Sequence, residues 1–202
     1  VSLEFRHDGL LTVAATKTVT INGSITAGLT QIFDTTAATS AIAFGETGLV
    51  SDVWCQWWGA LPSASAAVNT AAIQDCFDQV HATRDRVINV HICNGDYTIS
   101  DTIALTGSLD GDGFSLNGHE TAAIIQETNA KNGLKFDTFA GLVIKDIRII
   151  GDTSATGNGL WLLSNRAAKI DNVYLKGFSH ALHSENGVLN TYNNISGNGA
   201  LY

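Results

Sequence analysis

Apolar and polar residues alternate along most of this chain, and between Gly141 and Gly199 the alternation recurs in three segments that can be superimposed. The segments are Ile144–Gly151, Ile170–Gly177 and Tyr192–Gly197. Each places Asp or Asn directly before a β-branched residue and ends on glycine. The step from Ile147 to Val173 is only slightly longer than the step from Val173 to Ile195. A unit recurring every 20–50 residues or so indicates stacked repeats, because one such unit cannot bury its apolar face alone.

The repeats show a strand period of two and no helical period, with Gly, Asp and Asn at the turns between short apolar runs. At roughly 23 residues per coil, residues 87–202 hold about five coils. We therefore expect an all-β solenoid in which Ile147, Val173 and Ile195 point inward and stack in one column.

A single convincing helix precedes these coils, over residues 70–82. Its apolar residues recur at helical spacing on one face: Ala72, Ile73, Cys76, Phe77 and Val80. Asn69 or Thr70 is the expected N-cap, because a side-chain oxygen there accepts a hydrogen bond from the first turn. The predicted organisation is an N-terminal strand module (1–50), a Trp-rich segment with a capping helix (51–86), and β-helix coils (87–202).

Within residues 1–50 the alternation is weaker. Residues 18–25 alternate on either side of Asn22-Gly23, which predicts strand, turn, strand, because Asn-Gly favours the tight turns of hairpins.

Three of the four tryptophans fall between Val53 and Ala60. One interpretation is an apolar plug over an open end of the core. The other is a sugar-stacking platform, with Trp57, Trp58 and, further along, Trp161 as candidates, because an indole ring offers an apolar face and a polar edge.

Composition narrows the class of protein. With 202 residues, of which 45% are hydrophobic, the chain can bury a sizeable core, and 20 Gly against 1 Pro favours strands joined by tight turns. A net charge of −8 argues against nucleic acid or an anionic membrane as partner. No apolar run is long enough to span a bilayer, and no signal peptide is visible at the start. The absence of Met leads us to expect a processed chain or part of a longer one.

The three cysteines, Cys55, Cys76 and Cys93, are odd in number and irregularly spaced, without a CxxC pair. They are expected to be small buried hydrophobic residues, and free thiols fit folding in a reducing cytosol.

Several short motifs occur together between residues 58 and 100. They are Trp58-Gly59-Ala60, the helix opening Asn69–Gln74, the β-branched strand Val87–Ile92, Asn94-Gly95-Asp96-Tyr97 and Ile99-Ser100. This combination resembles the pectate-lyase-like family of right-handed parallel β-helices, which includes phage tailspikes and many polysaccharide-active proteins. The resemblance covers roughly residues 50–202 and implies that the Trp-rich segment and helix cap the N-terminal end of the coils. The family's acidic Gly-Asp-Gly-x-x-Asp-Asp-Thr loop is replaced here by Leu61–Thr70, so no role of those acids can be transferred.

Candidate catalytic residues lie in the later repeats. Asp146, Asp171 and Asn172 are predicted to occupy equivalent places on successive coils, where such residues commonly satisfy turn backbone groups. The alternative is a carboxylate pair for glycoside cleavage, which needs two acids about 5–9.5 Å apart.

His183 and Glu185 are a second candidate, as a base with its orienting partner, against the alternative of a solvated turn. On a regular strand His180 and Leu182 share one face, whereas His183 and Glu185 share the other.

The run Asp110-Gly111-Asp112-Gly113 resembles part of a calcium-binding loop. An EF-hand requires Glu at the twelfth position, which is Thr121 here, so a plain turn is favoured. We expect no metal and no cofactor.

The leading functional hypothesis is the N-terminal part of a phage tailspike or tail fibre that binds, and in one version depolymerises, host-surface polysaccharide. Alternatives are a secreted bacterial polysaccharide lyase or glycoside hydrolase of the same fold, and a non-catalytic structural solenoid; fold alone does not decide among them. The expected location is a virion tail or the extracellular space, with other tail proteins as partners. We expect no complete active site in this chain. No cap is visible before Tyr202, so we expect either a continuing chain or cover by another chain, and the resemblance implies a homotrimer.

Overall fold

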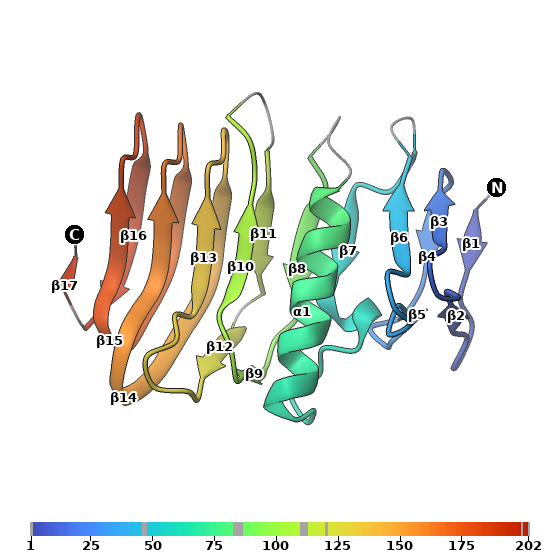
Figure 1. Ribbon diagram of the computed structural model, residues 1–202, viewed down its shortest axis with the longest axis horizontal. Helices are drawn as coiled ribbons and strands as arrows, with labels where there is room; N and C mark the ends of the chain where they lie inside the picture. Colours follow the sequence, from blue (N-terminus) through green and yellow to red (C-terminus); the bar gives the residue numbers. More distant parts are fainter. Residues whose placement is uncertain are drawn as a thin grey trace.

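The computed structural model describes residues 2–45, 48–82, 87–109, 113–119, 121–198 and 200–201. Strands make up 48% of the chain and helix 11%. Every strand pair in the described residues is parallel. The strands stack along one axis, with the helix α1 lying across the stack between the N-terminal strands and the rest (Figure 1). The fold is mostly β, with a large curled parallel sheet that is consistent with an all-β solenoid.

In chain order the elements are β1 (Leu3–Glu4), β2 (Leu11–Thr12), β3 (Thr18–Ile21), β4 (Ile25–Thr26), β5 (Phe33–Asp34), β6 (Ala41–Phe44), β7 (Asp52–Trp54), the 3-10 helix η1 (Cys55–Trp58), α1 (Ala66–His81), β8 (Asn89–Ile92), β9 (Asp96–Ile99), β10 (Ile103–Thr106), β11 (Ser115–Gly118), β12 (Ala123–Gln126), β13 (Leu134–Asp137), β14 (Val143–Leu163), β15 (Lys169–Glu185), β16 (Thr191–Gly197) and β17 (Ala200–Leu201).

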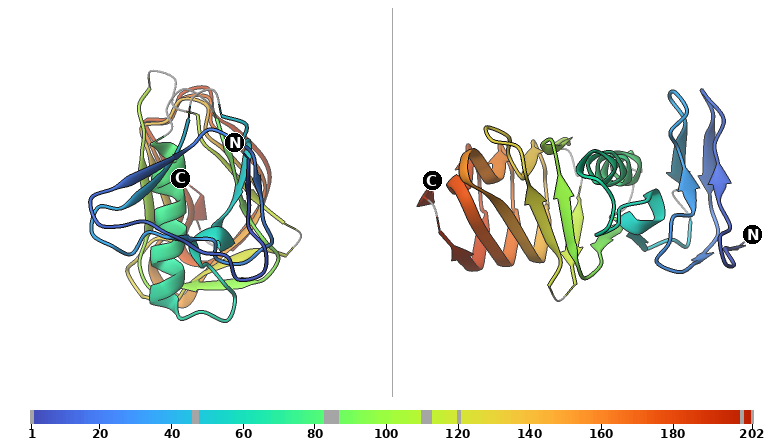
Figure 2. Two further views of the ribbon diagram at one scale, coloured as in Figure 1. Left: turned by 90° about the vertical axis from the view of Figure 1, so that its right-hand side faces the viewer. Right: turned by 90° about the horizontal axis from the view of Figure 1, so that it is seen from below.

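From β7 onward the strands form three ladders. The first contains β7, β8, β11 and the beginnings of β14, β15 and β16. The second contains β9, β12, the middle of β14 and β15, and the end of β16, and the third contains β10, β13, the ends of β14 and β15, and β17. One passage through all three ladders is a layer. Seen along the stacking axis, successive layers follow a common outline (Figure 2).

The predicted inward column is confirmed. Ile147 pairs in register with Val173, and Val173 pairs with Ile195. Ile147 and Val173 are 2% and 1% exposed, and Ile195, in the last layer, is partly buried against the same core. The alternation of β-branched inward residues with polar outward ones therefore sets the register of the later layers.

The N-terminal strands differ from the prediction. β1 pairs with β4, β2 with β5 and β3 with β6, all in parallel, so that each strand meets its partner one layer further along the stack. The predicted strand, turn and strand around Asn22-Gly23 are present as β3 and β4, but the two strands belong to different pairs and do not form a hairpin. Asn22 and Gly23 lie at a corner between β3 and β4. The strands β1 to β3 form one layer, and β4 to β6 form the next.

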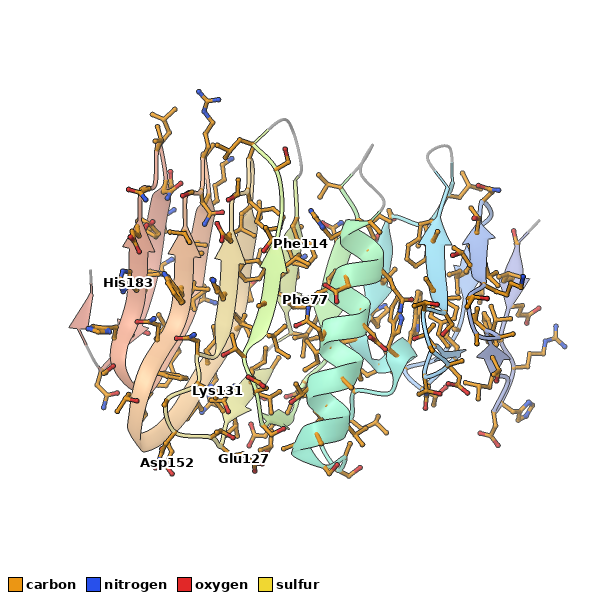
Figure 3. The ribbon with its side chains drawn as sticks, in the orientation of Figure 1. Phe77, Phe114, Glu127, Lys131, Asp152 and His183 are labelled. Atoms are coloured by element: carbon orange, nitrogen blue, oxygen red, sulfur yellow. The ribbon has the colours of Figure 1, made fainter. Side chains whose placement is uncertain are left out.

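The helix is confirmed, but it begins earlier than predicted. Ser65 is the N-cap, and its side chain accepts from the backbone N–H of Val68. Asn69, expected to cap, is instead fully buried and accepts from the backbone N–H of Leu61. The helix buries Phe77 against Phe114, with ring centroids 5.1 Å apart (Figure 3). Helical spacing places the apolar residues of α1 on the face toward the layers.

Two glutamines of α1 form hydrogen bonds with the backbone of the strands on either side of the helix. The Gln74 amide accepts from the backbone N–H of Ala104 at 2.9 Å and donates to its carbonyl at 2.7 Å, as a neighbouring strand would. On the other side, Gln79 accepts from the backbone N–H of Ile42 in β6 at 2.9 Å. The helix therefore takes the place of a strand in the third ladder, between β6 and β10, and supplies hydrogen bonds to both edges.

Candidate functional site

A groove of about 300 Å³ lies on the outer face of the first ladder. We call it the histidine groove, and its lining residues are His91, Asn117, Gly118, His119, Lys145, Asp146 and Asn172. They come from four successive layers and are polar or charged except for Gly118.

The pairing register explains why these side chains meet. Trp54, His91, Asn117, Lys145 and Asp171 occupy one outward column, because each pairs directly with the next. Their neighbours along each strand point inward and are buried: Val53, Val90, Leu116, Ile144 and Ile170. Adjacent strands in a sheet are separated by about 4.8 Å, so side chains in such a column are within contact distance.

Asp52, His91 and His119 form a hydrogen-bonded chain. His91 Nε2 lies 2.8 Å from Asp52 Oδ1, and His91 Nδ1 lies 2.9 Å from His119 Nε2. An ionised carboxylate only accepts, so His91 donates to Asp52 from Nε2 and, when neutral, accepts from His119 at Nδ1. Trp54 covers this pair, with ring centroids 4.7 Å from His91 and 4.8 Å from His119.

Asp52 stays ionised at the base of this chain. The Ser51 hydroxyl, the His91 ring and the Asn89 amide all donate to it, and these hydrogen bonds hold the pKa of the Asp52 carboxyl below its ordinary value, against the effect of partial burial. A carboxylate on one nitrogen of an imidazole fixes the tautomer and makes the other nitrogen more basic. The hydrogen bonds therefore orient the His91 ring and, through its Nδ1, the His119 ring.

The far wall of the groove is a corner with left-handed backbone. Asp146 and Asn172 both have positive φ, at 57° and 51°, and the Asn172 amide donates to Asp146 Oδ1 at 2.8 Å. Gly118 occupies the preceding layer at this corner, where a Cβ would overlap the Asp146 carbonyl oxygen. Glycine therefore allows the backbone of two layers to approach, and Lys145 stands exposed beside them.

The arrangement of the candidate carboxylates differs from the prediction. Asp146 is equivalent to Asn172, whereas Asp171 pairs with Lys145, so the two acids are not in equivalent places. The Asp171 carboxyl accepts from the Asn194 amide at 3.2 Å. Both acids therefore serve as acceptors for the asparagine of the next layer, and only Asp146 lines the histidine groove.

His183, Glu185 and Trp161 lie together on the third ladder (His183 is labelled in Figure 3). His183 Nε2 is 3.7 Å from Glu185 Oε2, a distance beyond a good hydrogen bond. Trp161 pairs in register with His183, with ring centroids 6.0 Å apart, and Lys135 Nζ lies 4.5 Å from the Trp161 ring centroid. The Trp161 indole ring therefore lies between Lys135 of the preceding layer and His183 of the following layer.

The expected facing of His180 is wrong. Ala181 and Leu182 are both buried, so a bulge between residues 180 and 182 breaks the alternation. His180 therefore lies on the outer face with His183, at 5.8 Å between ring centroids, and its Nδ1 contacts Asn158 Oδ1 at 3.1 Å.

Trp57 and Trp58 lie in the core, each 5% exposed. Their indole nitrogens donate to the Gly28 carbonyl and to the Gln79 side chain. Their burial agrees with the interpretation of this segment as an apolar plug over the core, and it leaves no ring face of either residue free to stack on a sugar. The partly exposed tryptophan of the segment is Trp54.

The proposed turn at 110–113 lies largely outside the described residues. Among those that the structure does describe, no three His, Cys, Asp or Glu side chains gather in a way that would hold a metal ion. No helix in that part of the chain has the length and apolar character needed to cross a membrane.

No sequence pattern indicated four residues at or beside the groove: Asp52, His91, His119 and Lys145. These residues are widely separated along the chain, each in a different stretch between turns, so no local motif connects them. The repeat alignment can be extended back from Lys145 to Asn117, His91 and Trp54. That extension would have placed His91 and Lys145 in one outward column. Comparisons with protein-family models, curated proteins and solved structures give no match for this chain.

Proposed function

We propose that this chain is part of a right-handed parallel β-helix of the phage tailspike or tail-fibre type, and that its histidine groove binds polysaccharide. The observation that carries the proposal is the groove itself. It is a polar hollow that crosses four successive layers, and amide, imidazole and ammonium groups line it. Sugar hydroxyls are recognised by such a combination of donors and acceptors with a nearby aromatic ring.

Lys145 gives the groove one exposed cation, which suits a glycan that carries carboxylate groups. The Asp146 carboxylate beside it keeps its charge and accepts from the Asn172 amide. An ammonium–carboxylate hydrogen bond is stronger than a neutral one, by roughly a factor of two. The chain's net charge of −8 makes a local cation more discriminating, because the remaining surface repels polyanions.

We expect Lys145→Ala to weaken binding of acidic polysaccharide by about ten- to a hundredfold, since a hydrogen bond to a charged group contributes roughly 1.5–3 kcal/mol. Affinity is measured by calorimetry against a panel of neutral and acidic bacterial polysaccharides. Lys169→Ala is the matched control, because Lys169 is also exposed on the first ladder but does not line the groove.

Equal losses for the two lysine variants would contradict a specific site in the groove. Failure of the unchanged protein to bind any member of the panel would favour the purely structural solenoid.

One observation favours cleavage as a second candidate function. The Asp52–His91–His119 chain places a carboxylate-supported imidazole at the groove, which is the arrangement of a general base. In a lyase, such a base removes the proton on the carbon next to a uronate carboxylate while a cation neutralises the charge that develops. The adjacent C–O glycosidic bond then breaks, a C=C bond forms, and the leaving oxygen takes up a proton from water. His119 and Lys145 are the residues we assign to proton removal and charge neutralisation, respectively.

If the chain cleaves an acidic polysaccharide, His119→Ala should lower the rate by about 100- to 10,000-fold while leaving binding within a few-fold. The assay follows unsaturated uronate by absorbance. Asp171→Asn, outside the groove, should retain the rate. A rate unchanged by His119→Ala would exclude this base.

The same proposal places the protein in a virion tail, as a homotrimer alongside other tail proteins, with a secreted bacterial enzyme as the alternative. The parallel stacking supports both, since each uses the same fold.

A further inference from the structure

The helix creates a difference in thickness within one layer. An α-helix with its side chains is about 10 Å across, whereas a strand occupies about 4.8 Å along the stack. The layer formed by β7, η1 and α1 is therefore about two strands thick in the third ladder. In the first ladder the same layer contains only β7, which leaves about one strand width between β7 and β4.

The structure has a hollow of about 370 Å³ at this position. Its lining residues are Ser24, Ile25, Thr26, Ala27, Leu49, Val50, Ser51, Asp52, Trp54 and Trp57. We call it the β4–β7 slot. It lies between β4, one of the N-terminal strands, and β7, the first strand of the first ladder.

Both sides of the slot are sheet edges with backbone groups facing across it. β4 accepts from β1 at the carbonyls of Ser24 and Thr26, and in a parallel pair the alternate residue points the other way. The N–H and C=O of Ile25 therefore face the slot. On the opposite side the Ser51 carbonyl accepts from Asn89, so the N–H and C=O of Asp52 face the slot.

The corresponding positions in the other two ladders are filled. In the third ladder, the side-chain amides of α1 satisfy the edges of β6 and β10. In the second, η1 contacts the preceding segment, with the Ile32 N–H donating to the Trp57 carbonyl at 3.0 Å. Within the described residues, β4 and β7 pair only with β1 and β8 respectively. Exposed parallel edges of this kind favour the addition of a strand.

We propose that the β4–β7 slot binds an extended peptide segment of a partner protein, which adds as a strand and hydrogen-bonds to both edges. An extended polypeptide alone presents alternating N–H and C=O groups on both of its sides at the spacing that two strands require. This proposal rests on the two sheet edges and does not require polysaccharide binding in the histidine groove, although Asp52 and Trp54 border both sites.

The slot also constrains the side chains of the peptide. Inward residues would meet Ile25, Val50 and Trp57, which are buried or half-buried, so they should be small and apolar. Outward residues would stand beside the ionised Asp52 carboxylate, at the rim of a chain with a net charge of −8, so they should be neutral or basic. A peptide of about five residues, with Val inward and Lys or Thr outward, spans roughly 17 Å, which is enough to cover the two-residue edge of β4 and the three-residue edge of β7.

The test uses the 202-residue chain and the acetylated, amidated peptide Thr-Val-Lys-Val-Thr. Binding is followed by backbone amide NMR shifts, with Ile25, Asp52 and Trp54 as the expected reporters. The same peptide with N-methyl groups on alternate residues has fewer donors and a blocked edge, and we expect its affinity to be at least tenfold lower.

A pair of protein variants provides the complementary control. Ile25→Pro removes the N–H that faces the slot while leaving the bonds from β4 to β1, whereas Ile25→Val retains that N–H. We expect Pro to weaken binding about fivefold or more relative to Val. Equal binding of the methylated peptide, shifts confined to the outer edge of β16, or displacement of the peptide by a linear neutral oligosaccharide would each overturn the proposal.

Discussion

Replacing Val173 with Asp is expected to abolish soluble folding. Val173 is 1% exposed and lies between Ile147 and Ile195 in the inward column. A carboxyl group placed there has no partner in an apolar column, so it must either remain charged without solvation or take up a proton at a strongly raised pKa. Either way the cost is several kcal/mol, a large share of the roughly 5–15 kcal/mol that stabilise a typical domain.

The control is Lys176→Asp on the same strand, β15. Lys176 is exposed, so the same new carboxylate is solvated there and should change the free energy of unfolding by less than about 1 kcal/mol. The measurement is the soluble fraction after expression, followed by urea unfolding of whatever is soluble. A folded Val173→Asp protein with stability close to that of Lys176→Asp would show that the column is not a closed core.

The later layers could be predicted because their inward residues and corners repeat in the sequence. Each inward residue of the column directly follows an Asp or Asn: Ile147, Val173 and Ile195. The preceding polar residues occupy the same left-handed corner in successive layers, with φ of 57° at Asp146, 51° at Asn172 and 49° at Asn194. Asp and Asn tolerate this conformation better than other non-glycine residues, so the corner is visible in the sequence as a recurring polar residue.

The N-terminal layers could not be predicted in the same way. Four of their six strands, β1, β2, β4 and β5, are two residues long, which is too short to show a period. The local Asn22-Gly23 signal favours a hairpin, but each flanking strand gains a parallel partner in the neighbouring layer instead. Long-range pairing and burial of Ile21 and Phe44 outweighed the local turn preference.

The histidine groove shows why a site is harder to predict than a fold. Its members are single residues from different layers, and the offset along the chain from one layer to the next is not constant. The step from Asn117 to Lys145 is longer than the steps on either side of it in the same column. An error of one residue in any offset turns an outward side chain inward. The His180 bulge is such a case, since strict alternation predicts the opposite face for this residue.

Gln79→Ala is expected to cause the second large loss of stability, and to separate the N-terminal layers from α1. Gln79 is 7% exposed, and its Oε1 accepts from both the Ile42 N–H at 2.9 Å and the Trp58 indole N–H at 3.0 Å. Its Nε2 donates to the Thr35 hydroxyl at 3.2 Å. Alanine leaves two buried donors without an acceptor, at about 1–3 kcal/mol each, so we expect a loss of roughly 3–5 kcal/mol.

Gln74→Ala on the same helix makes the same chemical change at a partly exposed position. It also removes a pair of hydrogen bonds to one residue, Ala104, but water can replace them there because Ala104 is exposed, so the expected loss is about 1 kcal/mol or less. Urea unfolding compares the two variants, and amide hydrogen exchange reports where protection is lost. Ile42 should exchange faster in Gln79→Ala, whereas Ile103 should keep its protection. Equal losses in the two variants would mean that burial does not set the cost, and that α1 does not hold the N-terminal layers through this amide.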